Sequence, residues 1–412
     1  MIKGARILIV TSVNLSANPR SLKEIRSLVA AGADVTVIKF TFDNWSNENE
    51  QRIEEELKNV KWVRISATRK PYFPWLASTL ASALSTYMLK VFKTSDKLKA
   101  YSLDKRSYLL HKALNGLKPE YDIIIAHNPG TFWAVSNYAI ANNIPFAVDI
   151  EDYHAGEQGH EVNETLRSLM NNVLKKAVYI SAASPLILQH IISDIAVDKP
   201  AFVLNNVFQL SMQPAFKDFD AVLPLKLIWF SQYVGLNRGV QDIIRALNLI
   251  DSFPVHLTLM GNCDEQTASA LKRLLSNSKH TLHFKKPCSE AELLETVSEH
   301  HIGLALEPAF SINNDLALSN KILTYLLAGN AIIVSDTKAQ ELFINTYPQV
   351  GKVYKKGAHK ELATVLSLLF NDVDHLYELR RAAYQLAKTE LNWEKEQNIF
   401  LKHVAANIHH AA

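Results

Sequence analysis

The residues with the clearest potential to bind a charged ligand are Ser319, Asn320 and Lys321. They precede an apolar stretch that stops at Gly329, and the strand-like run 331–334 follows at once. Serine is favoured before the first turn of a helix and glycine where a helix ends, so the pattern predicts a short helix that opens at Ser319. A helix start has free N–H groups and a positive dipole, Lys321 would add a full charge, and a diphosphate suits both. The alternative is a core helix with a surface lysine.

A loop after the apolar run 227–230 is the second candidate for phosphate binding. It contains Gly235, Asn237, Arg238 and Gly239. The glycines allow the backbone to pass close to a ligand, and an arginine guanidinium can bind two phosphate oxygens at once. A solvated surface arginine is the alternative interpretation.

Two more residues of this half follow predicted strands. Gly261 follows the run 255–260, where backbone could lie beside a base, although a simple turn would also use a glycine. Glu307 follows the run 302–306, where a carboxylate could accept hydrogen bonds from sugar hydroxyls.

Candidates for acid–base chemistry lie in the first half of the chain. His127 follows the strand-like run 122–126, and Asp149, Glu151 and Asp152 lie where the next run ends. One of these acids could orient or deprotonate a substrate hydroxyl, and the sequence does not distinguish them. A structural histidine and a solvated acidic turn are the alternatives.

The segment Asn18-Pro19-Arg20 follows the first strand-like run. Proline suits the first turn of a helix, so Asn18 and Arg20 are expected at a helix start that faces the ligand. A G-x-G-x-x-G fingerprint is missing here, so no dinucleotide cofactor is expected.

Apolar runs alternate with helical patterns along the chain, which predicts an α/β protein with two doubly wound, Rossmann-like parallel sheets. The first domain, 1–206, has predicted strands at 7–11, 35–40, 60–65, 122–126, 146–149, 179–181 and 202–204. After a linker at 207–225, the second domain, 226–390, has predicted strands at 227–230, 255–260, 282–284, 302–306 and 331–334. Open sheets bind ligands at the carboxyl ends of their strands, so we expect the domains to face each other across a cleft. An Asp-x-Asp pair at 218 and 220 lies in the linker rather than at a strand end, so no metal is expected.

Bulk properties exclude several classes of protein. The chain has 412 residues, 48% of them hydrophobic and 21% charged, as expected for a folded protein. A net charge of +3 does not favour nucleic acid as a partner. Two cysteines give no disulfide framework, and the N-terminus has no signal-peptide pattern, so we expect a cytoplasmic protein.

The positive charge is concentrated in one segment. Residues 69–112 contain nine Lys or Arg and two Asp, a net charge of 9 − 2 = +7, and 71–89 contains no charged residue. Aromatic and apolar residues beside lysines suit contact with an anionic membrane, and an ordinary amphipathic surface helix is the alternative. The membrane interpretation would place the protein at the inner face of the cytoplasmic membrane.

The segment Ser319-Asn320-Lys321, with Tyr325 and Ala328-Gly329, resembles the S-N-K-x-x-x-Y-x-x-A-G motif of family 4 type glycosyltransferases, in the branch that acts in bacterial surface polysaccharide synthesis. The run 229–239 is similar to the first strand and loop of that family's second domain, where a basic residue before a glycine, here Arg238, approaches the donor phosphates. This resemblance implies the GT-B fold, with a C-terminal helix, 391–412, that crosses back to the first domain.

The resemblance also implies an enzyme that transfers a sugar from a UDP-, GDP- or dTDP-sugar to a saccharide or lipid-linked acceptor, with retention of configuration and without a metal or other cofactor. The chain departs from the family in one respect. The paired glutamates of the family, spaced E-x7-E, fall on Leu316 and Thr324 here. A sugar-nucleotide 2-epimerase of the same fold, or a binding subunit without catalysis, are therefore the alternatives.

Overall fold

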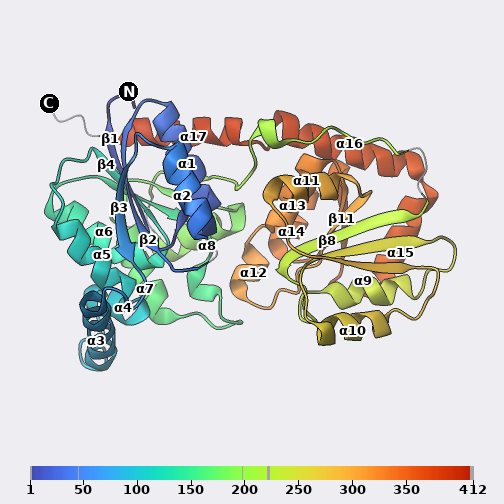
Figure 1. Cartoon of the computed structure of the whole chain (residues 1–412), viewed down its shortest axis with the longest axis horizontal. Helices are drawn as coiled ribbons and strands as arrows, with labels where there is room; N and C mark the ends of the chain where they lie inside the picture. Colours follow the sequence, from blue (N-terminus) through green and yellow to red (C-terminus); the bar gives the residue numbers. More distant parts are fainter. Residues whose placement is uncertain (1, 45, 197, 220–222, 409–412) are drawn as a thin grey trace. The chain divides into compact units, whose positions relative to one another are not determined.

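The chain folds into two compact units. The computed structural model describes residues 2–408 except 45, 197 and 220–222, so Asp220 of the Asp-x-Asp pair lies outside the described residues. One unit comprises Met1–Leu204 with Gln397–Ala412, and the other comprises Asn205–Glu396. Figure 1 shows the course of the chain through both units.

The first unit is built on a seven-stranded sheet in which all neighbouring strands are parallel, in the order β3-β2-β1-β4-β5-β6-β7. The strands are β1 (Arg6–Thr11), β2 (Asp34–Thr41), β3 (Lys61–Ser66), β4 (Ile123–His127), β5 (Phe146–Ile150), β6 (Ile180–Ala182) and β7 (Ala201–Val203). The helices are α1 (Pro19–Ala30), α2 (Asn47–Glu56), α3 (Tyr72–Met88), α4 (Asp96–Leu103), α5 (Arg106–Asn115), α6 (Pro129–Ala141), α7 (Glu164–Leu174) and α8 (Pro185–Ile195), with 3₁₀ turns η1 (Leu15–Ala17) and η2 (His154–Gly156).

The second unit has a six-stranded parallel sheet in the order β10-β9-β8-β11-β12-β13. The strands are β8 (Leu225–Tyr233), β9 (Val255–Asn262), β10 (Thr281–Lys285), β11 (Ile302–Ala305), β12 (Ala331–Ser335) and β13 (Gly351–Tyr354). The helices are α9 (Val240–Leu247), α10 (Glu265–Leu274), α11 (Glu290–Ser298), α12 (Ile312–Leu316), α13 (Asn320–Ala328), α14 (Lys338–Thr346), α15 (His359–Asn371) and α16 (Val373–Thr389), with 3₁₀ turns η3 (Leu210–Met212) and η4 (Pro348–Val350).

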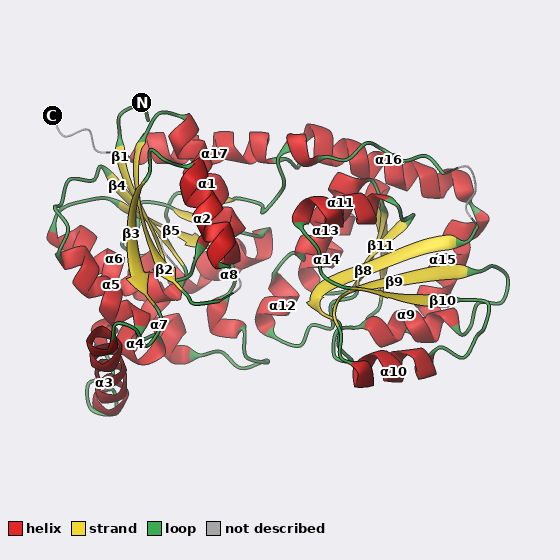
Figure 2. Cartoon of the chain, in the orientation of Figure 1, coloured by secondary structure: helices red, strands yellow, loops and turns green. Residues whose placement is uncertain are grey.

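Each sheet is covered on both faces by helices, as Figure 2 shows. The central strands are therefore buried on both sides, and the continuous apolar run from Ile7 to Val10 in β1 has no exposed side chain. All twelve predicted strands are present, to within a few residues at each end. The α/β class with two parallel sheets is confirmed, and β13 is an additional edge strand that the sequence analysis missed.

The last helix, α17 (Trp393–Asn407), carries the chain from the second unit into the first, since the boundary between Glu396 and Gln397 falls within it. Its second half belongs to the first unit, where the His403 ring stacks on Phe202 with 3.9 Å between centroids. Among the described residues, no helix is long and apolar enough to cross a bilayer.

The segment expected as a linker, 207–225, packs on α16 in the part that the structure describes. Tyr384 and Tyr377 donate hydrogen bonds to the carbonyl oxygens of Pro214 and Phe219. Arg380 is buried and donates to the carbonyl oxygen of Lys217. This segment is therefore fixed to the second unit.

A tight contact between β11 and α13 fixes the helix that carries the predicted phosphate site. A Cβ atom at Gly303 would overlap the Tyr325 ring, whose hydroxyl donates to the carbonyl oxygens of Leu304 and Ile228 at 2.9 and 3.3 Å. We predict that Gly303→Ala lowers the free energy of unfolding by about 1–3 kcal/mol, since the ring has nowhere to move without losing these bonds.

Thermal denaturation of the whole chain measures this effect. Gly235→Ala is the matched control in the same unit, because a Cβ atom there would meet its nearest neighbour, Arg238 Cγ, at 3.8 Å. Equal melting temperatures for the two variants would contradict the prediction.

Candidate functional site

The second unit contains a pocket of about 460 Å³ beside the start of α13. It is lined by Phe230, Ser231, Gln232, Met260, Pro287, Cys288, Leu293, Ser319, Asn320 and Lys321. The predicted residues Ser319, Asn320 and Lys321 thus lie on one side, next to the carboxyl ends of β8 and β9. Apolar side chains form most of the remaining wall.

The ion pair between Lys321 and Glu307 dominates the charge of this pocket. Lys321 Nζ lies 2.5 Å from Glu307 Oε1, and the Glu307 carboxylate also accepts hydrogen bonds from Ser319 Oγ at 3.0 Å and Asn314 Nδ2 at 3.2 Å. Burial raises the pKa of Glu307, but Lys321 and these donors lower it below its usual value. Glu307 is therefore ionised, and it holds Lys321 at the helix start.

The start of α13 differs in one respect from the expectation. Ser319 occupies the N-cap position, but its side chain makes no capping hydrogen bond, and its hydroxyl donates to Glu307. The N–H groups of the first turn thus have no side-chain cap, which is the condition for an anion to bind them. Gly329 ends the helix in the left-handed conformation, with φ 77°, as predicted.

The loop of Arg238 comes close to Glu307 through the backbone. Gly239 is the N-cap residue before α9, with φ 74°, and a Cβ atom there would overlap the carbonyl oxygen of Leu306, the residue before Glu307. Gly235 and Asn237 lie in this loop, and Arg238 is half-buried. These loop residues are not among those that line the 460 Å³ pocket. The contact of Gly239 with Leu306 is what brings their loop near Glu307.

Gly261 serves as a close backbone contact between β9 and β8. Its φ is 155°, and a Cβ atom would lie 2.5 Å from the carbonyl oxygen of Ser231, which lines the pocket. Gly261 therefore shapes the strand end beside the pocket without lining it.

In the first unit, the predicted residues form a buried network of charges. Arg20 binds Asp149 with both branches of its guanidinium, Nε to Oδ2 at 2.6 Å and Nη2 to Oδ1 at 2.7 Å. Arg20 also donates to the carbonyl oxygen of Leu204, and Asp149 accepts from Ser181. Asp149 and Arg20 are 0% and 2% exposed, so both point into the interior and neither presents its charge to solvent.

His127 connects this ion pair to two glutamates. Its Nε2 lies 3.1 Å from Glu24 Oε2, and its Nδ1 lies 3.3 Å from Glu151 Oε1 and 3.6 Å from Asp149 Oδ2. Burial alone would lower the pKa of His127, but Glu24, Glu151 and Asp149 together raise it to about 10. Burial raises the pKa of Asp149, yet Arg20 and His127 lower it below its usual range.

Glu151 is the acid of this network that reaches solvent, with 19% of its side chain exposed. It accepts hydrogen bonds from Asn18 Nδ2 at 2.5 Å and from Asn128 Nδ2 at 3.3 Å. Asn18 is 1% exposed and caps α1 by accepting from Ser21 N. Asp152 is the next residue and is half-buried.

Glu24, His127 and Asp149 bring ligand atoms within 4.8 Å of one another, a spacing that could hold a metal ion. The guanidinium of Arg20 lies in the same place, bound to Asp149 and 4.0 Å from Glu24 Oε1. Arg20 therefore supplies the positive charge that a metal ion would bring, so Glu24, His127 and Asp149 do not fit a metal ion.

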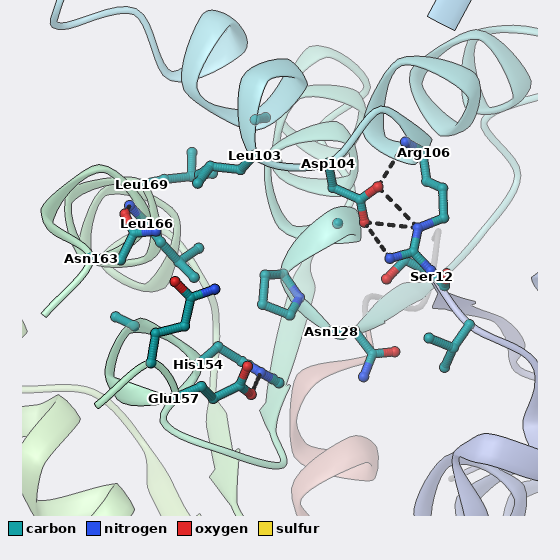
Figure 3. A pocket seen from close by; sticks show the side chains of 16 residues that line it. Ser12, Leu103, Asp104, Arg106, Asn128, His154, Glu157, Asn163, Leu166 and Leu169 are labelled. Carbon is teal, nitrogen blue, oxygen red and sulfur yellow. Dashed lines mark hydrogen bonds and ion pairs between the residues drawn. The ribbon is translucent and has the colours of Figure 1, made fainter. Parts of the chain in front are cut away.

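A second pocket, of about 420 Å³, lies within the first unit (Figure 3). Its lining residues are Ser12, Val13, Ala100, Leu103, Asp104, Arg106, Asn128, Pro129, Gly130, His154, Ala155, Glu157, Gln158, Asn163, Leu166 and Leu169. None of them is among the site residues predicted from the sequence, although Asn128 and His154 follow the predicted strand ends and four lie in the basic segment 69–112. One wall is apolar and the other is rich in hydrogen-bonding groups.

Two ion pairs organise the polar wall of the 420 Å³ pocket. Arg106 binds Asp104 at 2.9 Å and donates to the carbonyl oxygen of Ser12 at 2.8 Å. His154 Nδ1 lies 2.6 Å from Glu157 Oε1, a contact that raises the pKa of His154 against the lowering effect of burial. Since Asn128 lines this pocket and binds Glu151, the charge network adjoins the pocket.

The pKa of His127 predicts a specific dependence of stability on pH. Because the folded pKa, about 10, exceeds the unfolded value of about 6.5, the stabilisation is complete below pH 6.5 and is lost as pH rises towards 10. We predict that His127→Asn removes this alkaline decrease. Chemical denaturation between pH 6 and about 10 measures it, as the difference between wild type and variant.

The control for this experiment is His160→Asn, at an exposed position. It should leave the alkaline decrease as in wild type. A decrease of the same size in the His127 variant would show that His127 is not the group that titrates.

Several solved structures are similar to this chain over nearly its whole length. A glycosyltransferase from Rickettsia africae ESF-5 is 13% identical with TM-score 0.66, covering 98% of each chain. HepE of Anabaena in complex with UDP is 12% identical with TM-score 0.67, covering 97% of this chain and 100% of that one. Sucrose-phosphate synthase from Thermosynechococcus elongatus is 13% identical with TM-score 0.64, covering 98% and 100%. No protein-family model and no curated protein matches the sequence. The likeness extends over both units, and the chain has the GT-B fold of these glycosyltransferases.

Proposed function

We propose that this protein is a glycosyltransferase that moves a sugar from a nucleotide-sugar donor to an acceptor hydroxyl. The observation that carries this proposal is the pocket beside α13. It combines Lys321, a helix start without a side-chain cap and a largely apolar opposite wall. A cation and the N–H groups of a helix start suit a diphosphate, and the apolar wall suits a nucleobase.

In the proposed reaction, the acceptor oxygen attacks the anomeric carbon and the bond from that carbon to the diphosphate oxygen breaks. Lys321, the α13 N-terminus and Arg238 stabilise the negative charge on the departing diphosphate. The acceptor hydroxyl loses its proton to an oxygen of the departing diphosphate as its own oxygen bonds to carbon. These groups would supply the positive charge without a metal, and retention of configuration follows from the family resemblance.

On the acceptor side, we propose that Glu151 faces the substrate. Of the three acids at the end of β5, Asp149 is engaged by Arg20 and Ser181, whereas Glu151 is partly exposed. Asp149 and His127 then act as positioning residues that hold Glu151. The 420 Å³ pocket next to Asn128 is large enough for a saccharide, and its polar wall suits hydroxyl groups.

The proposal also includes the sugar donor and the cellular location of the reaction. A UDP-sugar is the first donor to test, because HepE was solved with UDP and with UDP-glucose; GDP- and dTDP-sugars follow. We place the reaction in cell-surface polysaccharide biosynthesis, in the cytoplasm at the inner face of the membrane, with a saccharide or lipid-linked acceptor.

The decisive test is nucleotide binding by the Lys321→Ala variant. Removing a charged donor to phosphate costs about 1.5–3 kcal/mol, so UDP affinity should fall about 10- to 100-fold in isothermal titration. Lys338→Ala is the matched control, since this lysine of the same unit has an exposed side chain that pairs with Asp315 and does not line the pocket.

Two further measurements separate the outcomes. Lys321→Met combined with Glu307→Gln avoids a buried unpaired carboxylate, so loss of UDP affinity with normal folding in this variant isolates the effect on the ligand. No binding of UDP, GDP or dTDP by wild type would overturn the transferase proposal. Binding without slow donor hydrolysis would favour a binding subunit.

A further inference from the structure

Helix α3 exposes an apolar stripe. Phe73, Leu80, Leu84 and Tyr87 are between 59% and 81% exposed, and their spacings of 7, 4 and 3 residues place them on one face of the helix. Tyr72 at the helix start, and Val91 and Phe92 in the following turn, extend the exposed apolar surface at both ends. Figure 1 shows α3 at the periphery of the first unit, beyond α4.

The opposite face of α3 has the reverse character. Ser78 and Ser85 are its buried residues, and α3 packs on α4 and α5. The Ser78 hydroxyl donates within the helix, to the carbonyl oxygen of Trp75 at 2.8 Å. These two serines thus seat the helix on the protein, while the four large side chains of the stripe point outwards and Trp75 and Leu76 are half-buried. This arrangement is opposite to that of an ordinary surface helix.

Basic residues lie at both ends of this helix. Arg69 and Lys70 precede it, and Lys90, Lys93 and Lys97 follow, with no charged residue in 71–89. Arg69 and Lys90 lie over the rings of Trp75 and Tyr87, at 5.4 and 5.7 Å from the centroids. Lysine and arginine at the ends of an apolar stretch suit the headgroup level of an anionic bilayer.

A second copy of the chain fits this surface poorly. Since both ends of α3 are basic, pairing with the same helix of another copy brings like charges together whether the helices run parallel or antiparallel. The exposed apolar patch runs along the whole of α3, whose 17 residues at about 1.5 Å each give a length of about 25 Å. A patch of this length is more than the single exposed apolar residues that are normal on a protein surface.

We propose that α3 lies flat on an anionic lipid surface, with Phe73, Leu80, Leu84 and Tyr87 in the acyl region and the flanking lysines among the headgroups. This contact places α4, whose Ala100 and Leu103 line the 420 Å³ pocket, next to the lipid surface. The acceptor is then a lipid-linked saccharide whose lipid stays in the bilayer. This assignment of the acceptor rests on the proposed glycosyl transfer.

Cosedimentation of the full chain with vesicles tests the surface. Wild type should bind phosphatidylcholine vesicles that contain about 30 mol% phosphatidylglycerol, and bind less at about 0.5 M NaCl or without the anionic lipid. Leu80→Ser with Leu84→Ser should weaken partitioning at least about tenfold, since two exposed apolar side chains no longer enter the bilayer. Lys90→Glu with Lys93→Glu should abolish the dependence on anionic lipid.

The control is Leu249→Ser with Leu368→Ser, two exposed leucines of the second unit, which should bind vesicles like wild type. UDP affinity should be unchanged in the α3 variants, so a failure of the lipid proposal is distinguishable from a failure of the donor site. Absence of vesicle binding by wild type would overturn the proposal. A dimer in sedimentation velocity that the α3 variant abolishes would assign the face to a second copy instead.

Discussion

The first unit depends on one buried ion pair. Arg20 at the start of α1 binds Asp149 of β5 and the carbonyl oxygen of Leu204, and Asp149 accepts from Ser181 of β6. A guanidinium without solvent is tolerated only if its donors are satisfied, and here Asp149 and the carbonyl oxygen of Leu204, just after β7, are the acceptors. Asp149 also lies 3.6 Å from His127 Nδ1, and together with Glu24 and Glu151 it keeps His127 charged. Through His127 it holds Glu151, the one acid of the network that reaches solvent.

In the second unit, close backbone contacts hold the charged side chains of the candidate site in place. Gly239 lies against Leu306 and Gly303 lies against Tyr325, so α9, β11 and α13 approach closely. These contacts fix Glu307, and Glu307 in turn fixes Lys321. In each unit a charged side chain of the candidate site is thus held by a buried partner, Glu151 by His127 in the first and Lys321 by Glu307 in the second.

Local signals in the sequence predicted the fold well. Apolar runs gave the strands, and the spacing from Ser319 to Gly329 gave α13, because strand and helix ends follow from neighbouring residues. The roles of the side chains were harder to predict, because the residues that bind each other are distant in sequence. Arg20 and Asp149 are 129 residues apart, and the Ser319 hydroxyl binds Glu307 instead of capping its helix.

Other features of the structure had no recognisable signal in the sequence. The strand β13 has only four residues and begins with glycine, so its pattern is too short to recognise. The 420 Å³ pocket combines residues from several helices and loops that no spacing relates. In α3, periodicity could not tell which face meets the protein, because the buried positions are serines whereas four large side chains, Phe73, Leu80, Leu84 and Tyr87, are exposed.

The ion pair of Lys321 and Glu307 has a consequence for the energetics of ligand binding. A phosphate that takes over the ammonium of Lys321 weakens the interaction that keeps the buried Glu307 carboxylate ionised. The pKa of Glu307 then rises, so binding is coupled to proton uptake and is favoured at lower pH. The heat of binding should accordingly vary with the ionisation enthalpy of the buffer, and a heat that is the same in every buffer would mean that Glu307 keeps its charge throughout.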